Sequence, residues 1–242
     1  SMGEPKIDLE KLRKHKSDVV SQLTGGLQAL ANKRKVTVIQ GIATFASDHS
    51  FSINNNGKQS TVGFKSAIVA AGSRSVSLPF IPEDDRIVDS TGALELPTNK
   101  GRMIVLGGGI IGCEMATVYQ AIGMKVTVVE MIDQIMPGAD PDIVAPCKKM
   151  MEKQGIEFLL TTKVTQVKAT KACLEVTLEG EGASKDTQKF DMMLVSVGRR
   201  PNGDQLDCDK AGVIVDSRGF ITVNKHLQTN IPHIFAIGDL CA

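Results

Sequence analysis

The chain has 242 residues, of which 42% are hydrophobic and 23% are charged, which is typical of a soluble globular protein. A net charge of +1 without a basic tail argues against nucleic acid or an anionic membrane as the main partner. No apolar run approaches the roughly 20 residues that span a bilayer. Five cysteines lie scattered without a CxxC or CxxxxC spacing. This pattern predicts free thiols in a reducing, cytoplasmic compartment and indicates no metal site.

The first hundred residues carry helix and strand signals in turn. Apolar side chains at helical spacing predict a helix over residues 7–31. The strong turn signal Asn54–Gly57 and a Pro-, Asp- and Ser-rich connector over 78–98 separate the later elements, and we place a domain boundary near residue 98. Four short runs in this part predict strands, namely Val36–Gln40, Ile42–Phe45, Phe51–Ile53 and Lys65–Ala71.

From residue 102 the pattern changes to alternating strands and helices. Met103–Leu106 and Lys125–Val129 are short apolar runs typical of buried parallel strands. Ile110–Ile122 and residues 141–154 have helical spacing, and Pro146 should kink the second helix. Six further strands are predicted at Ile156–Leu160, Val164–Lys168, Leu174–Leu178, Phe190–Val197, Gly219–Val223 and His233–Gly238. The chain is therefore expected to have an α/β fold.

The strongest motif is a glycine run between a predicted strand and a predicted helix. Gly107, Gly109 and Gly112 satisfy the GxGxxG spacing, with Ile110 and Ile111 inside it. In this motif the first glycine allows a tight turn, the second lets a pyrophosphate approach the backbone, and the third lets helix and strand pack closely. Unpaired N–H groups and the helix dipole then favour phosphates. The alternative is a tight strand–helix turn that binds nothing.

Two glutamates extend this motif. Glu130 ends the second predicted strand, 23 residues after Gly107, where a ribose-binding carboxylate belongs. At ~4 Å and an effective dielectric of ~20 it repels each unit charge of a 2′-phosphate by about 4 kcal/mol. No Lys or Arg occurs between residues 131 and 147 to offset this, so NAD is favoured over NADP, unless Glu130 is simply a solvated strand end. Glu114, in the first helical turn, either pairs with the helix dipole or faces a redox centre.

Four segments together resemble the pyridine nucleotide–disulfide oxidoreductase family, in the same order and spacing and over nearly the whole chain. They are Ile68–Ser73, the glycine motif with Glu114, Gly198–Asn202 and Ala236–Asp239. Within that family, three stretches are especially similar to the bacterial dihydrolipoyl dehydrogenases. These stretches are Leu78–Pro82, Asp89–Leu94 and Gly108–Met115.

The resemblance implies positions for two cofactors, NAD and FAD. The implied NAD positions are Gly107, Gly109, Ile110, Ile111, Gly112, Glu114, Glu130, Val164 and Gly198. The implied FAD positions are Ala43, Gly72 and Asp239, the last of which holds the ribityl–phosphate portion of the flavin. The plainer readings are that Asp239 caps a strand and that Arg199 and Arg200 are a surface charge pair.

The chain also departs from the family pattern. A second GxGxxG loop for FAD and the redox pair CxxxxC are absent, and Cys113 stands where an aliphatic residue is usual. The family's C-terminal dimerisation domain supplies a catalytic His–Glu pair, which none of the four histidines at 15, 49, 226 and 233 matches. We therefore assign no catalytic residue and expect an internal fragment that turns over no dihydrolipoamide, retains no stable FAD and binds NAD weakly.

The resemblance implies a Rossmann-like NAD-binding domain, built of a parallel sheet and a β-meander, inserted in a partial FAD-binding domain. We place the NAD-binding domain at residues 99–224 and the FAD-binding pieces at 1–98 and 225–242. Missing partner strands should leave exposed apolar surface and unpaired sheet edges in these pieces.

For the parent protein, the resemblance implies oxidation of protein-bound dihydrolipoamide, with electrons passing through a disulfide and FAD to NAD. The implied partners are a second copy in a homodimer, a substrate lipoyl domain, and a 2-oxo acid dehydrogenase complex such as the pyruvate dehydrogenase complex. The alternatives are a soluble pyridine nucleotide transhydrogenase, another flavin disulfide reductase, or a stand-alone NAD-binding module.

Overall fold

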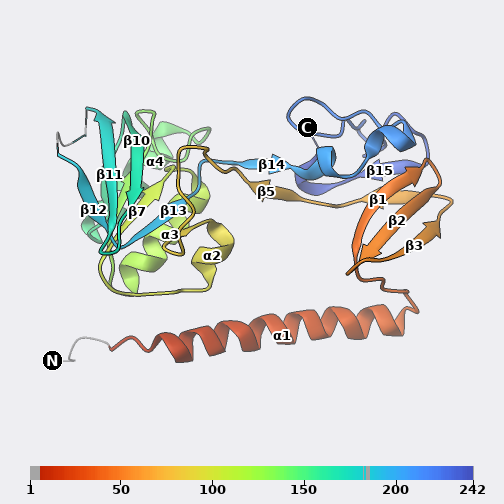
Figure 1. Ribbon diagram of the computed structural model, residues 1–242, viewed down its shortest axis with the longest axis horizontal. Helices are drawn as coiled ribbons and strands as arrows, with labels where there is room; N and C mark the ends of the chain where they lie inside the picture. Colours follow the sequence, from red (N-terminus) through yellow and green to blue (C-terminus); the bar gives the residue numbers. More distant parts are fainter. Residues whose placement is uncertain (1–5, 182, 184–185, 242) are drawn as a thin grey trace. The chain divides into compact units, whose positions relative to one another are not determined.

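A computed structural model describes residues 6–181, 183 and 186–241 of the chain (Figure 1). The chain divides into two compact units. Unit 1 comprises the residues up to Gln22 together with Ser75–Gly198, and unit 2 comprises Leu23–Arg74 together with the residues from Arg199 onward. Among the described residues, no helix is both long and apolar enough to cross a membrane.

Unit 1 is built on a five-stranded parallel sheet with the strand order β6-β13-β7-β8-β9. The strands are β6 (Ile87–Val88), β7 (Arg102–Leu106), β8 (Lys125–Val129), β9 (Glu157–Leu159) and β13 (Met192–Val195). Its helices are α2 (Ser90–Leu94), α3 (Ile110–Ala121) and α4 (Pro141–Lys153). A separate antiparallel meander consists of β10 (Thr162–Ala169), β11 (Leu174–Gly180) and β12 (Gln188–Phe190). The predicted α/β fold, with its parallel sheet and meander, is confirmed.

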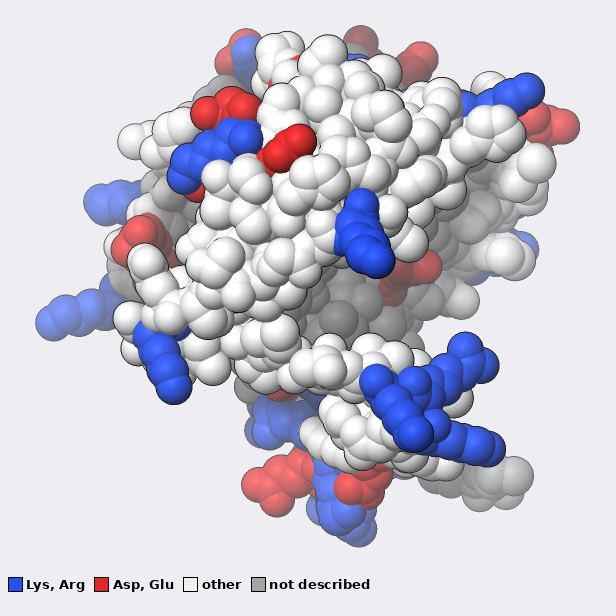
Figure 2. All heavy atoms as spheres, turned by 90° about the vertical axis from the view of Figure 1, so that its right-hand side faces the viewer, with Lys and Arg blue, Asp and Glu red and all other residues white. Residues whose placement is uncertain are grey.

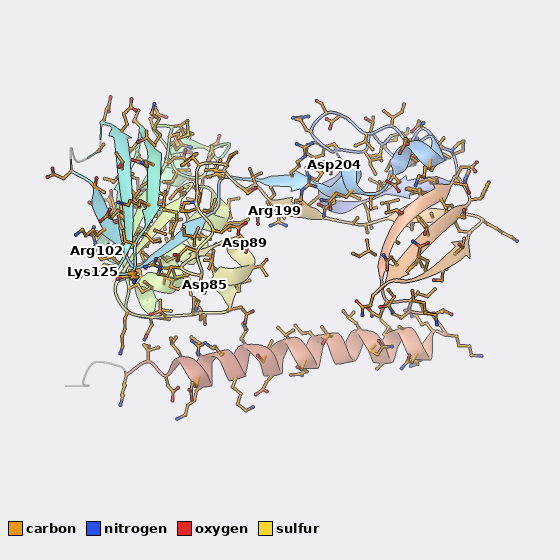
Figure 3. All side chains as sticks on the ribbon, viewed as in Figure 1. Asp85, Asp89, Arg102, Lys125, Arg199 and Asp204 are labelled. Carbon is orange, nitrogen blue, oxygen red and sulfur yellow. The ribbon has the colours of Figure 1, made fainter. Side chains whose placement is uncertain are left out.

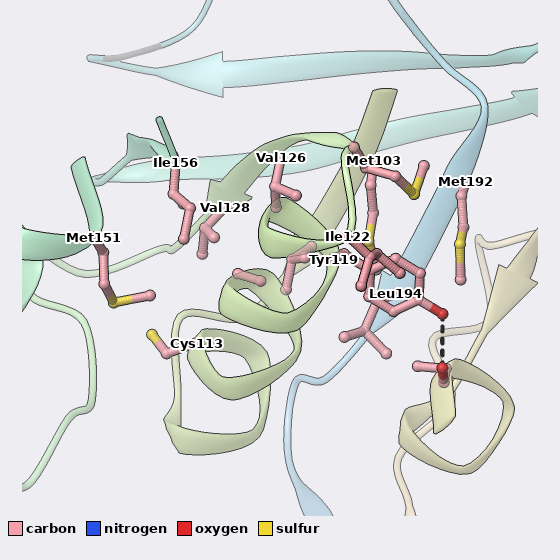
Figure 4. Close-up of a cluster of buried hydrophobic side chains, with 14 of the residues drawn as sticks. Met103, Cys113, Tyr119, Ile122, Val126, Val128, Met151, Ile156, Met192 and Leu194 are labelled. Atoms are coloured by element: carbon pink, nitrogen blue, oxygen red, sulfur yellow. Dashed lines mark hydrogen bonds between the residues drawn. The ribbon is translucent and has the colours of Figure 1, made fainter. Parts of the chain in front are cut away.

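The core of unit 1 lies on both faces of this sheet. Alternate side chains of β7 enter opposite clusters, because successive residues of a strand point to opposite faces. Met103 and Val105 join the cluster that α3 contributes to, whereas Ile104 and Leu106 join the cluster that contains β11 side chains. Figure 4 shows the first cluster, in which the buried hydroxyl of Tyr119 donates a 2.6 Å hydrogen bond to the Ala93 carbonyl. Burial on both faces explains why the central strands are continuous apolar runs.

Unit 2 contains several small sheets. Strands β1 (Ile42–Ser47), β2 (Ser50–Asn55) and β3 (Lys58–Gly63) form an antiparallel meander, and β4 (Ala67–Val69) pairs in parallel with β15 (Ile234–Ala236). Short 3-10 turns η1, η2 and η3 span Asn202–Gln205, Cys208–Ala211 and Gly238–Leu240. The strands β5 (Ser73–Ser75) and β14 (Arg199–Pro201) pair where the chain passes between the units. A third core cluster centres on Phe45, Ile221, Ile234 and Leu240.

The long helix α1 (Leu9–Lys33) confirms the helix predicted over residues 7–31, but none of its residues is buried. Its apolar positions from Val19 to Leu30 are exposed. In the part that belongs to unit 1, Arg13 donates from Nη2 to the Leu96 carbonyl at 2.7 Å. The helical periodicity therefore predicted the element correctly, but of its apolar positions only Leu9 and Leu12 pack against the core of unit 1.

Two predicted strands are wrong. Val36–Gln40 has no strand assignment, and Gly219–Val223 forms only isolated bridges from Ile221 to Val215 and Cys241. Both segments have strand-like composition, but a strand also needs a neighbour that continues the ladder.

The compact units have different limits from the predicted domains. Residues 75–98 belong to unit 1, where β6 pairs with β13, and residues 199–224 group with unit 2. The second difference arises because Phe45 of β1 binds the Leu206 carbonyl through its N–H and shares a core cluster with Cys208 and Val213.

Candidate functional site

The glycine motif forms a tight turn between β7 and α3. Gly107 has φ of 96°, a conformation that favours glycine, and a Cβ there would lie 2.4 Å from the Ser196 carbonyl oxygen. A Cβ at Gly112 would lie 2.0 Å from the Gly107 carbonyl oxygen. At Gly109 a Cβ would meet nothing within 4 Å. The first and third glycines are therefore required by packing, whereas the second borders open space.

Helix α3 begins without a side-chain cap. Its N-cap residue Gly109 is extended and has no side chain that could accept a hydrogen bond from the first-turn amides. Further along, the Cys113 N–H donates to the Gly109 carbonyl at 3.0 Å. The amides that precede Cys113 have no partner within the helix, so they can donate to an anion at the positive end of the helix dipole.

Glu130 stands directly after β8 and is tied to the glycine turn. Its Oε2 accepts a 2.8 Å hydrogen bond from the Gly108 N–H, and its Oε1 accepts one from the Ile132 N–H at 3.2 Å. Main-chain bonds to Leu159 and Thr162 hold the residue on both sides. The carboxylate is half-buried, and each of its oxygens retains a lone pair for a further donor.

A cavity of about 670 Å³ opens at this end of the sheet in unit 1, within the size range of small-molecule sites. Five of the predicted NAD positions line it, namely Gly107, Gly109, Glu130, Val164 and Gly198. Val76, Leu78 and Phe80 add an apolar wall from the segment that the sequence suggested was only a connector. The cavity thus combines an apolar wall, one carboxylate and the glycine turn.

The other predicted NAD positions lie on α3 outside the lining of this cavity. The Ile110 side chain is 65% exposed, and Glu114 is exposed one turn further along the helix. Ile111 is half-buried, and Gly112 is buried against the turn. Ile110 and Ile111 can therefore contribute main-chain amides at the helix start, whereas Gly112 acts through packing.

Sequence reasoning missed two residues that hold the turn in place. The Ser196 hydroxyl donates to the carbonyls of Leu106 and Gly107, at 2.8 and 3.2 Å. The Met136 N–H donates to the Gly108 carbonyl at 2.7 Å. The sequence pattern pointed to neither residue. The parallel pairing of β13 with β7 places Ser196 beside the turn, and Met136 contributes only its main-chain N–H.

The fold also brings a cation to the cavity that the sequence spacing did not predict. Lys163 lines the cavity, and its ammonium lies 3.2 Å from Glu179 in an ion pair that is half-exposed. Such an exposed pair contributes about 0–1 kcal/mol. Lys163 is therefore a nearby positive charge that opposes the repulsion between Glu130 and a 2′-phosphate.

Cys113 occupies the interior of the turn as a small apolar residue. Its thiol is 5% exposed and donates to the Gly108 carbonyl at 3.3 Å. Burial raises the pKa of the thiol to about 11. The thiolate needed for reactivity is therefore disfavoured, and this cysteine serves packing.

In unit 2 the structure joins Asp239 to two of the family-like segments. Its carboxylate accepts a 2.6 Å hydrogen bond from the Ser73 hydroxyl, which in turn accepts one from Arg199 Nε at 2.7 Å. Arg200 instead pairs with Asp204, at 3.0 Å; Figure 3 labels Arg199 and Asp204. Arg199 and Arg200 thus have separate partners rather than forming one surface charge pair.

The remaining predicted FAD positions are also in unit 2. Gly72 has φ of 64°, and a Cβ there would meet nothing within 4 Å. Its carbonyl accepts a hydrogen bond from the Asn202 N–H at 3.0 Å. Ala43 is exposed on β1. Both positions are accessible to a ligand.

The parallel sheet, the glycine turn and the acid after the second strand define a Rossmann-like α/β protein. The chain belongs to the pyridine nucleotide-disulphide oxidoreductase family, whose model matches residues 2–242. It is 51% identical over 240 residues to a dihydrolipoyl dehydrogenase of Haemophilus influenzae and 49% identical over 239 residues to one of Vibrio cholerae. Each alignment covers 98% of this chain and 50% of the relative, so the chain spans about half the length of these relatives.

Solved structures support the same family. The HOCl-induced flavoprotein disulfide reductase RclA from Escherichia coli matches with a TM-score of 0.86 and 28% identity. The match covers 97% of this chain and 53% of that one. A Cu(II) complex of the same reductase matches with a TM-score of 0.86 and 27% identity, over 95% of this chain and 52% of that one.

Proposed function

We propose that the cavity of unit 1 binds NAD, with the pyrophosphate at the start of α3 and the adenosine ribose at Glu130. One observation carries this proposal: the Glu130 carboxylate and the open side of Gly109 line the same cavity, beside the uncapped end of α3. The amides supply donors for phosphate oxygens, and the carboxylate accepts hydrogen bonds from ribose hydroxyls.

The same geometry favours NAD over NADP. A 2′-phosphate would meet Glu130 in place of a hydroxyl, and the carboxylate is held there by the Gly108 and Ile132 amides. The Lys163 ammonium offsets part of the repulsion between Glu130 and the 2′-phosphate only if it breaks its ion pair with Glu179. The remaining penalty follows from placing two negative groups a few ångströms apart.

We also propose that the chain is the NAD- and FAD-binding portion of a dihydrolipoyl dehydrogenase, the E3 component of 2-oxo acid dehydrogenase complexes. The relatives of that name at 49–51% identity support this. The whole protein would then oxidise a lipoyl domain's dihydrolipoamide in the cytoplasm, as a homodimer. The transhydrogenase and the stand-alone module have no observation in their favour.

The residues of unit 2 fit FAD in part. Asp239 is exposed shortly after β15, and Gly72 and Gly238 have left-handed backbones with open space beside them. Bound FAD would carry electrons between a dithiol and NAD. The chain's own contribution is orientation: the Ser73 hydroxyl and Arg199 hold the Asp239 carboxylate in one direction.

Calorimetric titration of the whole chain with NAD and NADP tests the NAD site. We expect Glu130→Gln to weaken NAD binding about 10- to 100-fold, since a hydrogen bond to a charged group contributes about 1.5–3 kcal/mol, and to narrow the preference over NADP. Asp133→Asn, which neutralises a nearby acid, is the matched control and should bind as the wild type does. Equal NAD affinity in wild type and Glu130→Gln, or no NAD binding at all, would overturn the proposal.

A further inference from the structure

Two histidines that are 184 residues apart in the sequence stack on each other in unit 2. The rings of His49 and His233 are 4.1 Å apart between centroids, and their planes differ by 2°. The side chain of Asp48 lies beside them. One potential metal-ligand atom from each of the three residues lies within 4.8 Å of the others. The sequence alone indicated no metal site, because no short spacing joins these residues.

Main-chain hydrogen bonds fix the positions of both histidines. His49 lies in the two-residue turn between β1 and β2, and its carbonyl accepts a 2.9 Å bond from the Phe64 N–H. The His233 carbonyl accepts a 3.0 Å bond from the Ala67 N–H at the start of β4. The backbones of the two histidines are therefore held in place by different segments of unit 2, which limits the ordering cost of bringing the side chains together.

Each ring has one nitrogen engaged with a carbonyl oxygen. His49 Nδ1 lies 3.1 Å from the Phe64 carbonyl, and His233 Nε2 lies 2.7 Å from the Asp48 carbonyl. A carbonyl only accepts, so these nitrogens carry the proton and the other nitrogen of each ring presents its lone pair. A metal-binding histidine is usually oriented by such a bond from its second nitrogen.

The remaining ligand atoms are not engaged elsewhere. Within the described part of the chain, no hydrogen bond or ion pair is made by His49 Nε2, His233 Nδ1 or the Asp48 carboxylate. Asp48 and His49 are exposed and His233 is half-buried, so an ion can reach all three from solvent.

We propose that Asp48, His49 and His233 bind one Zn²⁺ ion, with water as the fourth ligand. Two imidazoles and a carboxylate suit zinc, at about 2.0–2.2 Å from each ligand atom. Tetrahedral bonds of that length need ligand atoms roughly 3.4 Å apart, so the exposed side chains must close inward and the two rings must tilt out of their parallel stack. The bound ion would then tie the β1–β2 turn to the segment that enters β15.

The competing explanation is that the rings stack without binding an ion. A stacked pair of this kind needs no third residue and no unpaired carboxylate. It also predicts that the ring signals are indifferent to zinc, whereas a bound ion changes both rings at once.

Zinc titration of the whole chain, followed by calorimetry and by the histidine ring signals in NMR, separates these explanations. We expect one site whose affinity falls more than tenfold in His49→Ala and in His49→Gln, together with zinc-dependent shifts of the His49 and His233 rings. His226→Ala, an exposed histidine of the same unit, is the matched control and should bind as the wild type does. All variants retain the five cysteines, so binding to thiols is a common background.

The proposal is overturned if His49→Ala and His49→Gln bind zinc as tightly as His226→Ala, or if saturating Zn²⁺ leaves the His49 and His233 ring signals unchanged. Magnesium, which prefers oxygen ligands, should shift neither ring. These outcomes do not depend on the NAD site, because Glu130 lies in unit 1 and the zinc ligands lie in unit 2.

Discussion

The two units bury their strands to different extents. In unit 1 the five-stranded sheet is covered on both faces, and Ile104, Met193 and Leu194 have no exposed surface. In unit 2 the parallel pair β4–β15 is covered on one side only, so that Ile68 is 67% exposed between the buried Ala67 and Val69. On β1, Ile42 is 76% exposed.

This difference affects what each unit can do alone. A sheet covered on both faces can position the turn, Glu130 and the cavity without further chain. Unit 2 has apolar strand residues open to solvent, and uncharged side chains cover much of the face shown in Figure 2. The predicted exposed apolar surface is thus present in unit 2, whereas the residues of the proposed NAD site are assembled within unit 1.

The largest expected effect compares a buried strand residue of the parallel sheet in unit 1 with an exposed strand residue of the parallel pair in unit 2. Leu194→Ala should destabilise unit 1 by about 2–5 kcal/mol through the cavity it leaves. Ile68→Ala should change the stability of unit 2 by no more than about 0.5 kcal/mol. Denaturant titration followed by hydrogen exchange at β7 and β15 measures the two units separately. Similar losses in both variants would contradict the difference in burial.

The second prediction concerns alkaline pH and applies to both units. Burial raises the pKa of Cys113 in unit 1 and of Cys208 in unit 2 from 9.0 to about 11. Below pH 9 both states keep the proton. Between pH 9 and 11 the unfolded thiol ionises first, so the free energy of unfolding should fall as pH rises, by on the order of 2 kcal/mol per thiol. Cys113→Ala should reduce this fall in unit 1 and leave that of unit 2 unchanged; a smaller fall remains in unit 1 near pH 11, because burial raises the pKa of Tyr119 to about 12. Stability measured at pH 8, 9.5 and 11 makes the test, and a fall of unchanged size in unit 1 would contradict the assignment.

The third prediction divides the glycine turn into packing and binding positions. Gly112→Ala places a Cβ against the Gly107 carbonyl and should destabilise unit 1 by about 1–3 kcal/mol. Gly109→Ala has open space around it and should leave stability nearly unchanged while it weakens NAD binding. Thermal melts and NAD titrations of both variants make the test. The distinction fails if Gly109→Ala destabilises the unit as much as Gly112→Ala does.

The sequence was sufficient to predict those elements whose structure depends on neighbouring residues alone. The run Gly107–Gly112 predicted a turn because Gly107 adopts a positive φ and Gly112 leaves no room for a Cβ, and the apolar runs at β7 and β8 predicted strands buried on both faces. Val36–Gln40 and Gly219–Val223 have comparable composition but lack continuous strand partners. Pairing is a property of the whole fold, so composition alone did not separate these cases.

The same limit applies to the candidate site. Glu130 was predictable because its distance from Gly107 is set by one strand–helix–strand unit. Ser196 and Lys163 reach the turn and the cavity through strands far along the chain, and His49 meets His233 across 184 residues. Such contacts depend on tertiary pairing, which a spacing rule does not contain.

The most direct test of the proposed NAD site is a ¹H–¹⁵N NMR titration of the whole chain with NAD. We expect the largest amide shifts at Gly107–Gly112, Glu130, Val164 and Gly198, with those of unit 2 unchanged, and much smaller shifts with NADP at the same concentration. Shifts confined to unit 2, or no shifts at the glycine turn with saturating NAD, would contradict the proposed site.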